Sequence, residues 1–164
     1  MLERLTARGL ALAASLGSAL LLAGAFAFQA AGHAPCELCI LQRWPHLAAA
    51  VAGVAVLAFG WRKALSAVGL LAALAATAFA IFHVGVEWQW WEGPMACTGG
   101  MGDIATLSTA ELMTRLSEAK VVRCDQPSFV FLGLSMAGWN AVCSAALSVL
   151  WALSLRRPRV AASR

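Results

Sequence analysis

The chain has 164 residues, of which 61% are hydrophobic and 12% carry a charge. This composition excludes an ordinary soluble domain, in which roughly a quarter of the residues are charged. The net charge of +4 comes from Lys and Arg residues that flank apolar segments, so it indicates no nucleic-acid partner. A single membrane domain, residues 1–164, embedded in a lipid bilayer is therefore expected.

Four long apolar segments follow one another along the chain, over about residues 10–31, 45–60, 64–86 and 129–155. A helix of about 20 residues crosses the hydrocarbon core of a bilayer, so these segments predict an all-α, integral membrane four-helix bundle. The second segment is short unless its helix starts near Ile40. Pro45 suits a first helical turn, where the missing N–H has no partner to lose. We expect this helix to begin near Arg43–Pro45, with Cys36–Cys39 at its mouth.

A cleaved signal peptide is the alternative interpretation of residues 1–31. The segment has a basic start and an Ala-rich end. Its apolar run of about 20 residues is longer than the roughly 7–15 residues of a signal peptide. The sequence therefore favours a retained first span.

Lys and Arg residues are distributed unequally between the two sides of the predicted bundle. Eight lie at the termini and in the turn between the second and third spans, against four in the other two loops: Arg43, Arg115, Lys120 and Arg123. Because cytoplasmic loops carry the excess of positive charge, both termini should be cytoplasmic. The loops over about 32–44 and 87–128, with their four cysteines, should then face the periplasm or the cell exterior, where disulfides persist.

The second outer loop is the only sizeable polar segment. It opens with a Trp-rich stretch, Glu87–Glu92, of the kind found at lipid headgroups. Ser108 and Glu111 form a capping box, which predicts a short amphipathic helix beginning at Thr109.

Two cysteine pairs lie outside the apolar segments. Cys36 and Cys39 have the C-x-x-C spacing of redox motifs, in which one thiolate attacks or releases the other. A zinc site is an alternative, but it requires a second close pair of ligands, and none is present. Cys97 and Cys124 flank the second outer loop, and they could instead form a structural disulfide that closes it. We expect the local pairs at rest and a Cys36–Cys124 pair as an exchange intermediate.

Three further residues are candidates for the same chemistry. Arg43 lies one helical turn after Cys39, where its charge would stabilise a thiolate or a reduced carbonyl oxygen; the alternative is an interfacial arginine that reaches the headgroups. Trp44 could form the wall for a flat aromatic ligand. His83 is an ionisable residue inside the third span and is either functional or satisfied by Glu87. Cys143, inside the fourth span, is expected to be a buried apolar residue.

The motif residues resemble the DsbB family of disulfide bond formation proteins. The resemblance covers about residues 34–140 and is specific at the Cys-x-x-Cys-x-x-x-Arg block. The matching segments are Pro35–Cys39, Gln42–His46, Glu92–Pro94, Cys97–Gly99, Cys124–Asp125, Phe131–Met136 and Gly138–Asn140. Cys143 is additional to the family pattern.

This resemblance implies a thiol:quinone oxidoreductase that reoxidises DsbA, a periplasmic thioredoxin-fold oxidant, and passes electrons to the membrane pool of ubiquinone or menaquinone. Cys97 matches the cysteine that forms a mixed disulfide with DsbA, and Cys124 matches its partner, which passes electrons to Cys36. Cys39 matches the thiolate that contacts the quinone, and Arg43 the arginine that assists there. His83 is similar in placement to a histidine near the quinone.

Two alternatives belong to other classes of protein. A vitamin K epoxide reductase-like oxidoreductase shares the four-helix quinone arrangement, but its Cys-x-x-Cys comes late in the bundle, whereas here it comes first. A non-catalytic tetraspan adaptor with two structural disulfides would not require Arg43 beside a Cys-x-x-Cys.

The predicted orientation can be tested with alkaline phosphatase fusions, because this enzyme is active only outside the cytoplasm. A fusion after Arg164 should be inactive, and a fusion within residues 106–108 should be active. The reverse pattern would contradict the orientation.

Overall fold

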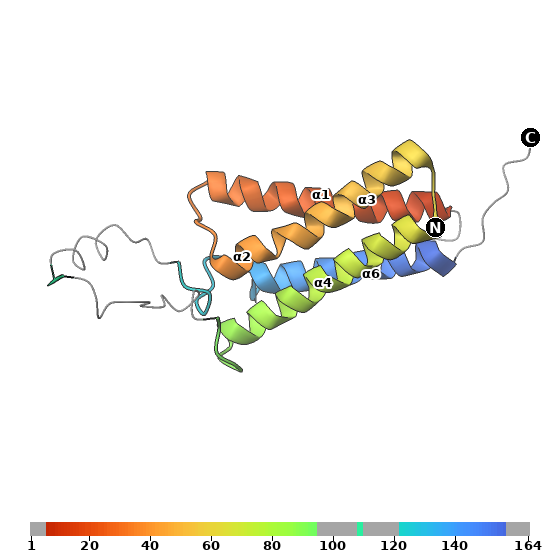
Figure 1. Ribbon diagram of the computed structural model, residues 1–164. Coiled ribbons are helices and arrows are strands. Elements are labelled where there is room, and N and C mark those ends of the chain that lie inside the picture. Colours follow the sequence, from red (N-terminus) through yellow and green to blue (C-terminus); the bar gives the residue numbers. More distant parts are fainter. Residues whose placement is uncertain (1–5, 95–107, 110–121, 157–164) are drawn as a thin grey trace, which may run out of the picture.

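The computed structural model describes residues 6–94, 108–109 and 122–156. Four helices are long and apolar enough to cross a membrane, which confirms the predicted four-helix bundle. The first described residues and the last lie at the same end of the bundle (Figure 1). The elements in chain order are α1 (Ala7–Ala30), α2 (Glu37–Leu41), α3 (Arg43–Phe59), α4 (Lys63–Glu87), β1 (Val130–Phe131), β2 (Leu134–Ser135) and α6 (Met136–Arg156).

The second span begins earlier than the predicted Arg43–Pro45. The short helix α2 runs into α3, and together they form one 23-residue span, Glu37–Phe59. Cys36 causes the early start, because its Sγ accepts a hydrogen bond from the Cys39 backbone N–H at 3.2 Å and so caps α2. At the other end of this span, Gly60 has a φ of 75°, which allows the sharp turn into α4.

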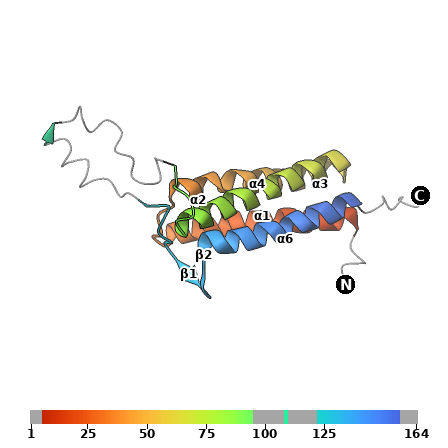
Figure 2. The ribbon, with the colours of Figure 1, turned by 90° about the horizontal axis from the view of Figure 1, so that it is seen from below.

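The fourth helix begins later than the predicted residue 129. Val130–Phe131 and Leu134–Ser135 pair as an antiparallel hairpin, which extends beside the start of α6 (Figure 2). Ser135 Oγ accepts a hydrogen bond from the Gly138 N–H at 3.1 Å, as an N-cap residue does, and donates one to the Glu87 carboxylate. The hairpin is therefore attached to the end of α4 as well as to α6.

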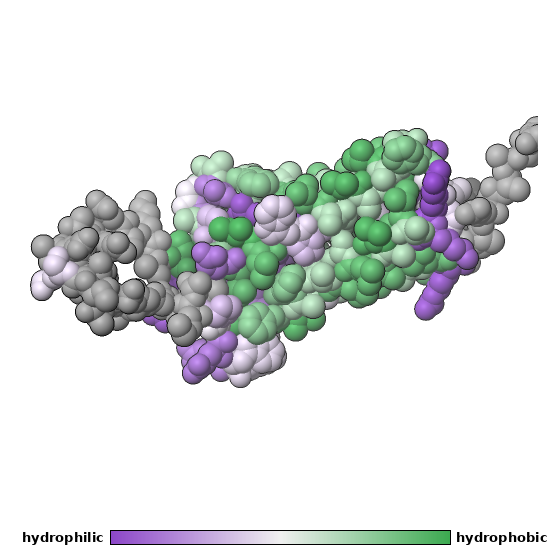
Figure 3. All heavy atoms as spheres, viewed as in Figure 1, coloured by the Kyte–Doolittle hydropathy of each residue, from purple (hydrophilic) through white to green (hydrophobic). Residues whose placement is uncertain are grey.

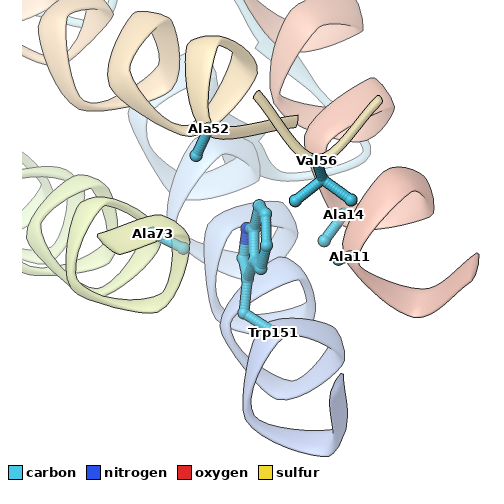
Figure 4. Close-up of a cluster of buried hydrophobic side chains, with 6 residues drawn as sticks. All are labelled: Ala11, Ala14, Ala52, Val56, Ala73 and Trp151. Carbon is cyan, nitrogen blue, oxygen red and sulfur yellow. The ribbon is translucent and has the colours of Figure 1, made fainter. Parts of the chain in front are cut away.

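The four spans pack in a ring, with α1 against α3 and α6, and α4 against α3 and α6. Trp151 fills the centre of one core cluster and is fully buried among the small side chains of Ala11, Ala14, Ala52 and Ala73 (Figure 4). Small residues let helices approach closely in a membrane, where apolar burial against lipid gives little driving force. Hydrophilic residues gather at the two ends of the bundle, and apolar residues cover the body between them (Figure 3).

The Trp151 contact yields a stability prediction. A Cβ atom added at Gly69 would lie 2.4 Å from the Trp151 ring, so Gly69→Ala should lower the free energy of unfolding by about 1–3 kcal/mol through overpacking. Gly24→Ala is the matched control, because an added Cβ there meets no atom within 4 Å. It should be neutral or stabilising by up to about 1 kcal/mol. Denaturant unfolding in detergent measures both, and equal effects would contradict the packing argument.

Candidate functional site

Three of the predicted cysteines gather at the end of the bundle where α2 begins. The Sγ atoms of Cys36 and Cys39 lie 2.7 Å apart, as free thiols in this structure. Cys36 and Cys124 are both buried in a second core cluster, together with Leu38 and Val86. The structure therefore brings Cys124, which follows the long outer loop, against the Cys-x-x-Cys motif. Cys97 lies outside the described residues, as does nearly all of the helix predicted from Thr109.

The two thiols of the motif are electrostatically unequal. The side-chain hydrogen bond with Cys39 raises the pKa of the Cys36 thiol, and burial raises it further. Both effects favour the protonated form of Cys36 over its thiolate.

His83 lies beside these sulfurs and is buried. Its Nε2 is 3.7 Å from Cys36 Sγ, and its Nδ1 is 2.8 Å from Gln42 Nε2. The backbone of Cys124 is another hydrogen-bonding neighbour of the ring. The alternative partner Glu87 hydrogen-bonds Ser135 instead. His83 thus lies between Cys36 of the Cys-x-x-Cys motif and Cys124.

The side chain of Gln42 connects His83 to a polar network that the sequence analysis did not predict. Asn140 Nδ2 donates to Gln42 Oε1 at 2.7 Å, and Asn140 Oδ1 is 2.9 Å from His46 Nε2. Ser144 Oγ donates to Asn140 Oδ1 at 3.3 Å. The sequence signal was the four-residue spacing of Gln42 and His46, and of Asn140 and Ser144, which places each pair on one face of an apolar helix.

Cys36, Cys39 and His83 could be considered as metal ligands, since their ligand atoms lie within 4.8 Å of one another. The hydrogen bonds around Gln42 argue against this use. Gln42 Nε2 donates to the Leu38 carbonyl at 3.0 Å, so the atom facing His83 Nδ1 is an N–H donor. A neutral His83 then carries its proton on Nε2, and an N–H at that position donates to sulfur and cannot bind a metal.

A cavity of about 570 Å³ opens beside Cys39, between α1, the start of α3 and the start of α6. This volume lies within the usual range for small-molecule sites. The lining is mainly apolar, and its polar and sulfur-bearing side chains include Cys39, Gln42, Arg43, His46, His83 and Asn140. Phe28, His33 and Phe129 form an aromatic cluster in the same lining, with ring centroids 5.3–5.9 Å apart.

Arg43 lines this cavity together with Cys39, which precedes Arg43 by one helical turn. Its guanidinium lies over the Phe26 ring, 4.7 Å from the centroid, and Nη1 donates to Gln29 Oε1 at 2.7 Å. Its Nε is buried and has no hydrogen-bond partner within the described part of the chain. Arg43 is thus held against α1 beside the cavity, and one of its donors is available.

Comparison with known proteins identifies the family. The chain matches the family described as "Disulfide bond formation protein DsbB" over residues 7–154. The chain belongs to the DsbB family. It is 30% identical to "Disulfide bond formation protein B" of Polaromonas sp. (strain JS666 / ATCC BAA-500), over 92% of this chain and 90% of the relative. The identity is also 30% to the protein of the same name from Verminephrobacter eiseniae (strain EF01-2), over 95% of this chain and 89% of the relative. No solved structure matches.

Membership in the DsbB family makes this chain a multi-pass membrane protein of disulfide bond formation. It also argues against the vitamin K epoxide reductase-like alternative.

Two other candidates for site residues lie apart from the cavity. Trp44 is 66% exposed on the outside of α3 and does not line the cavity, because successive residues of a helix point in directions about 100° apart. Cys143 is a free, half-buried thiol in α6 that is not in the cavity lining.

The shared cluster of Cys36 and Cys124 predicts that these residues can form a disulfide. In a variant with Cys39→Ser and Cys97→Ser, mild oxidation should join Cys36 to Cys124, as peptide mass spectrometry would show. The control carries Cys36→Ser as well, which leaves Cys124 with only Cys143, and it should form no internal disulfide. A control that cross-links as readily would show that the cluster does not set the pairing.

Proposed function

We propose that this DsbB family member is a thiol:quinone oxidoreductase of the bacterial inner membrane. It would reoxidise a periplasmic DsbA-like thioredoxin-fold protein and pass the electrons to ubiquinone or menaquinone. One observation carries the proposal. Cys39 lines an apolar cavity with Arg43, while its partner Cys36 lies in a buried cluster with Cys124. The Cys36–Cys39 pair is therefore adjacent both to a third buried cysteine and to a small-molecule site.

The cavity fits a quinone headgroup in both shape and chemistry. A quinone is flat and apolar and carries two ring oxygens that accept hydrogen bonds. The aromatic cluster of Phe28, His33 and Phe129 offers faces for such a ring. The buried Arg43 Nε, without a partner among the described residues, offers a donor to a ring oxygen. Bound here, the quinone would supply the final two-electron acceptor.

The residues of the chain would carry out the preceding thiol exchange. In the proposed sequence, the Cys97–Cys124 disulfide is attacked by a thiolate of the reduced partner, which forms a mixed disulfide at Cys97 and frees the Cys124 thiolate. Cys124 then attacks the Cys36–Cys39 disulfide at Cys36 Sγ, so a Cys36–Cys124 bond forms and Cys39 leaves as a thiolate. The second thiol of the partner resolves the mixed disulfide at Cys97, and the freed Cys97 thiolate resolves Cys36–Cys124. The Cys36–Cys39 dithiol left at the end holds the two electrons, beside the cavity.

The test is quinone reduction by the purified protein, with a reduced thioredoxin-fold partner and a soluble ubiquinone analogue. Wild type should consume quinone and partner thiols in a stoichiometry of one quinone to two thiols, and Cys39→Ser should consume neither. Cys143→Ala is the control and should stay within about twofold of wild type. Wild-type protein that oxidises its partner at the same rate without quinone would refute the proposal.

Arg43 should act at the quinone step more than in the thiol exchange. Loss of one preorganised electrostatic donor lowers a rate by roughly 10²–10³-fold, and Arg43→Ala should lie at the low end because Arg43 is only half-buried. Arg43→Lys should recover part of the rate, since it keeps the charge and loses the planar fork. Trapping of the Cys97 mixed disulfide in a Cys124→Ser background should be almost unchanged. Equal damage to both steps would make Arg43 a structural residue.

A further inference from the structure

The Leu38 carbonyl oxygen fixes the orientation of the Gln42 side chain. A carbonyl oxygen can only accept, so the Gln42 atom 3.0 Å from it is the amide nitrogen, and Gln42 Oε1 faces the other way. Gln42 is 5% exposed and lies in a protein interior, where each of these bonds is difficult to exchange for one to water. One backbone atom therefore sets the direction of every hydrogen bond that continues from this amide.

In one direction, the chain of hydrogen bonds continues from Gln42 to α6 and then returns to α3. Gln42 Oε1 accepts from Asn140 Nδ2, which leaves Asn140 Oδ1 facing His46. His46 must then donate from Nε2. Its Nδ1 ends the chain, buried and with no partner among residues 6–94, 108–109 and 122–156.

In the other direction, the chain of hydrogen bonds leads from Gln42 to the sulfur atoms. Gln42 Nε2 donates to His83 Nδ1, so the proton of a neutral His83 lies on Nε2, the atom 3.7 Å from Cys36 Sγ. In the reduced protein, Cys36 Sγ lies 3.7 Å from Nε2, the Cys124 backbone is a second hydrogen-bonding neighbour of the ring, and Cys36 Sγ also accepts the Cys39 backbone N–H at 3.2 Å. Its own S–H is left to donate to Cys39 Sγ, 2.7 Å away.

We propose that this chain of hydrogen bonds, which runs from His46 through Asn140, Gln42, His83 and Cys36 to Cys39, holds the negative charge on the Cys39 sulfur. Every donor in it points toward Cys39. Gln42 is the positioning residue that gives the chain its direction. The inference rests on the proposed function only in taking Cys39 as the sulfur that acts at the cavity.

The physical basis is cooperative polarisation. Each hydrogen bond in an aligned chain strengthens the donor of the next, and the effect is largest away from water. Arg43 is a second source of positive potential, but its guanidinium is also engaged by Gln29 and Phe26. The hydrogen-bond chain runs through residues of α3, α4 and α6, whereas the printed partners of Arg43 belong to α1. The two sources therefore contribute separately, and removing Gln42 should leave the Arg43 contribution in place.

The experiment uses the full-length protein, reduced and free of quinone, so it does not depend on whether quinone is the acceptor. In a background of Cys97→Ser, Cys124→Ser and Cys143→Ala, the alkylation rate of Cys39 at pH 7 measures its thiolate fraction. Imidazole ¹⁵N signals from labelled histidines report which ring nitrogen of His83 carries the proton. Gln42→Met removes the amide at nearly constant volume, and Asn140→Leu removes the next link while leaving Gln42 in place. Thr77→Val is the matched control, since it deletes a half-buried hydroxyl of α4 that donates to Ala73 O at 2.8 Å.

The parent should show His83 protonated on Nε2. Gln42→Met should give a mixture of the two tautomers and alkylate roughly fivefold more slowly at pH 7, the effect of one hydrogen bond. The difference should vanish near pH 10, where the thiol is ionised in both proteins. Asn140→Leu should show a smaller loss and Thr77→Val none. A parent His83 protonated on Nδ1 would overturn the proposal, as would an unchanged alkylation rate in a Gln42→Met protein with mixed tautomers. If Gln42→Met fails to fold, Asn140→Leu decides by its alkylation rate, with His83 still protonated on Nε2, and an unchanged rate would then overturn the proposal.

Discussion

The contact between the Cys39 amide and the Cys36 sulfur is the constraint on which the site depends. It begins the second span, because a sulfur takes the place that an oxygen usually occupies at a helix start. The same contact fixes the separation of the two sulfurs, since both belong to one helical turn. It also sets where Gln42, Arg43 and His46 emerge along the following turns. Helix initiation and redox geometry are therefore one feature of this sequence.

The bundle divides its packing between its two ends. Near the chain termini, small residues surround Trp151 and the helices approach closely. Near the sulfurs, the side chains between the helices are polar, and the space between α1, α3 and α6 opens into a cavity. Close packing at one end gives the rigidity that an open site at the other end requires. A network of amides and imidazoles then holds α3, α4 and α6 in register, where apolar side chains would permit sliding.

The sequence predicted the features that a single segment encodes. Hydropathy identified the four spans, and the Cys-x-x-Cys-x-x-x-Arg spacing placed Cys39 and Arg43 on the same side of one helix. It failed where a feature depends on contacts between segments. Phe129–Leu132 is apolar and short, so hydropathy joined it to the fourth span, although the hairpin Val130–Ser135 precedes α6. Trp44 was the expected aromatic wall, yet Phe28, His33 and Phe129 line the cavity from other segments. Gln42 and Asn140 are single amides in apolar helices, and no pattern within either helix indicates that they meet.

Burial of the sulfur cluster has a consequence for the selectivity of thiol exchange. Cys36 and Cys124 expose only 4% and 1% of their surface. Disulfide exchange requires an attacking sulfur to reach its target in line, so a dissolved thiol such as glutathione meets a closed surface at both residues. Packing therefore protects both sulfur atoms from reaction with small thiols. Under the proposed function, packing alone would keep small thiols from reducing the pair before its electrons reach the cavity.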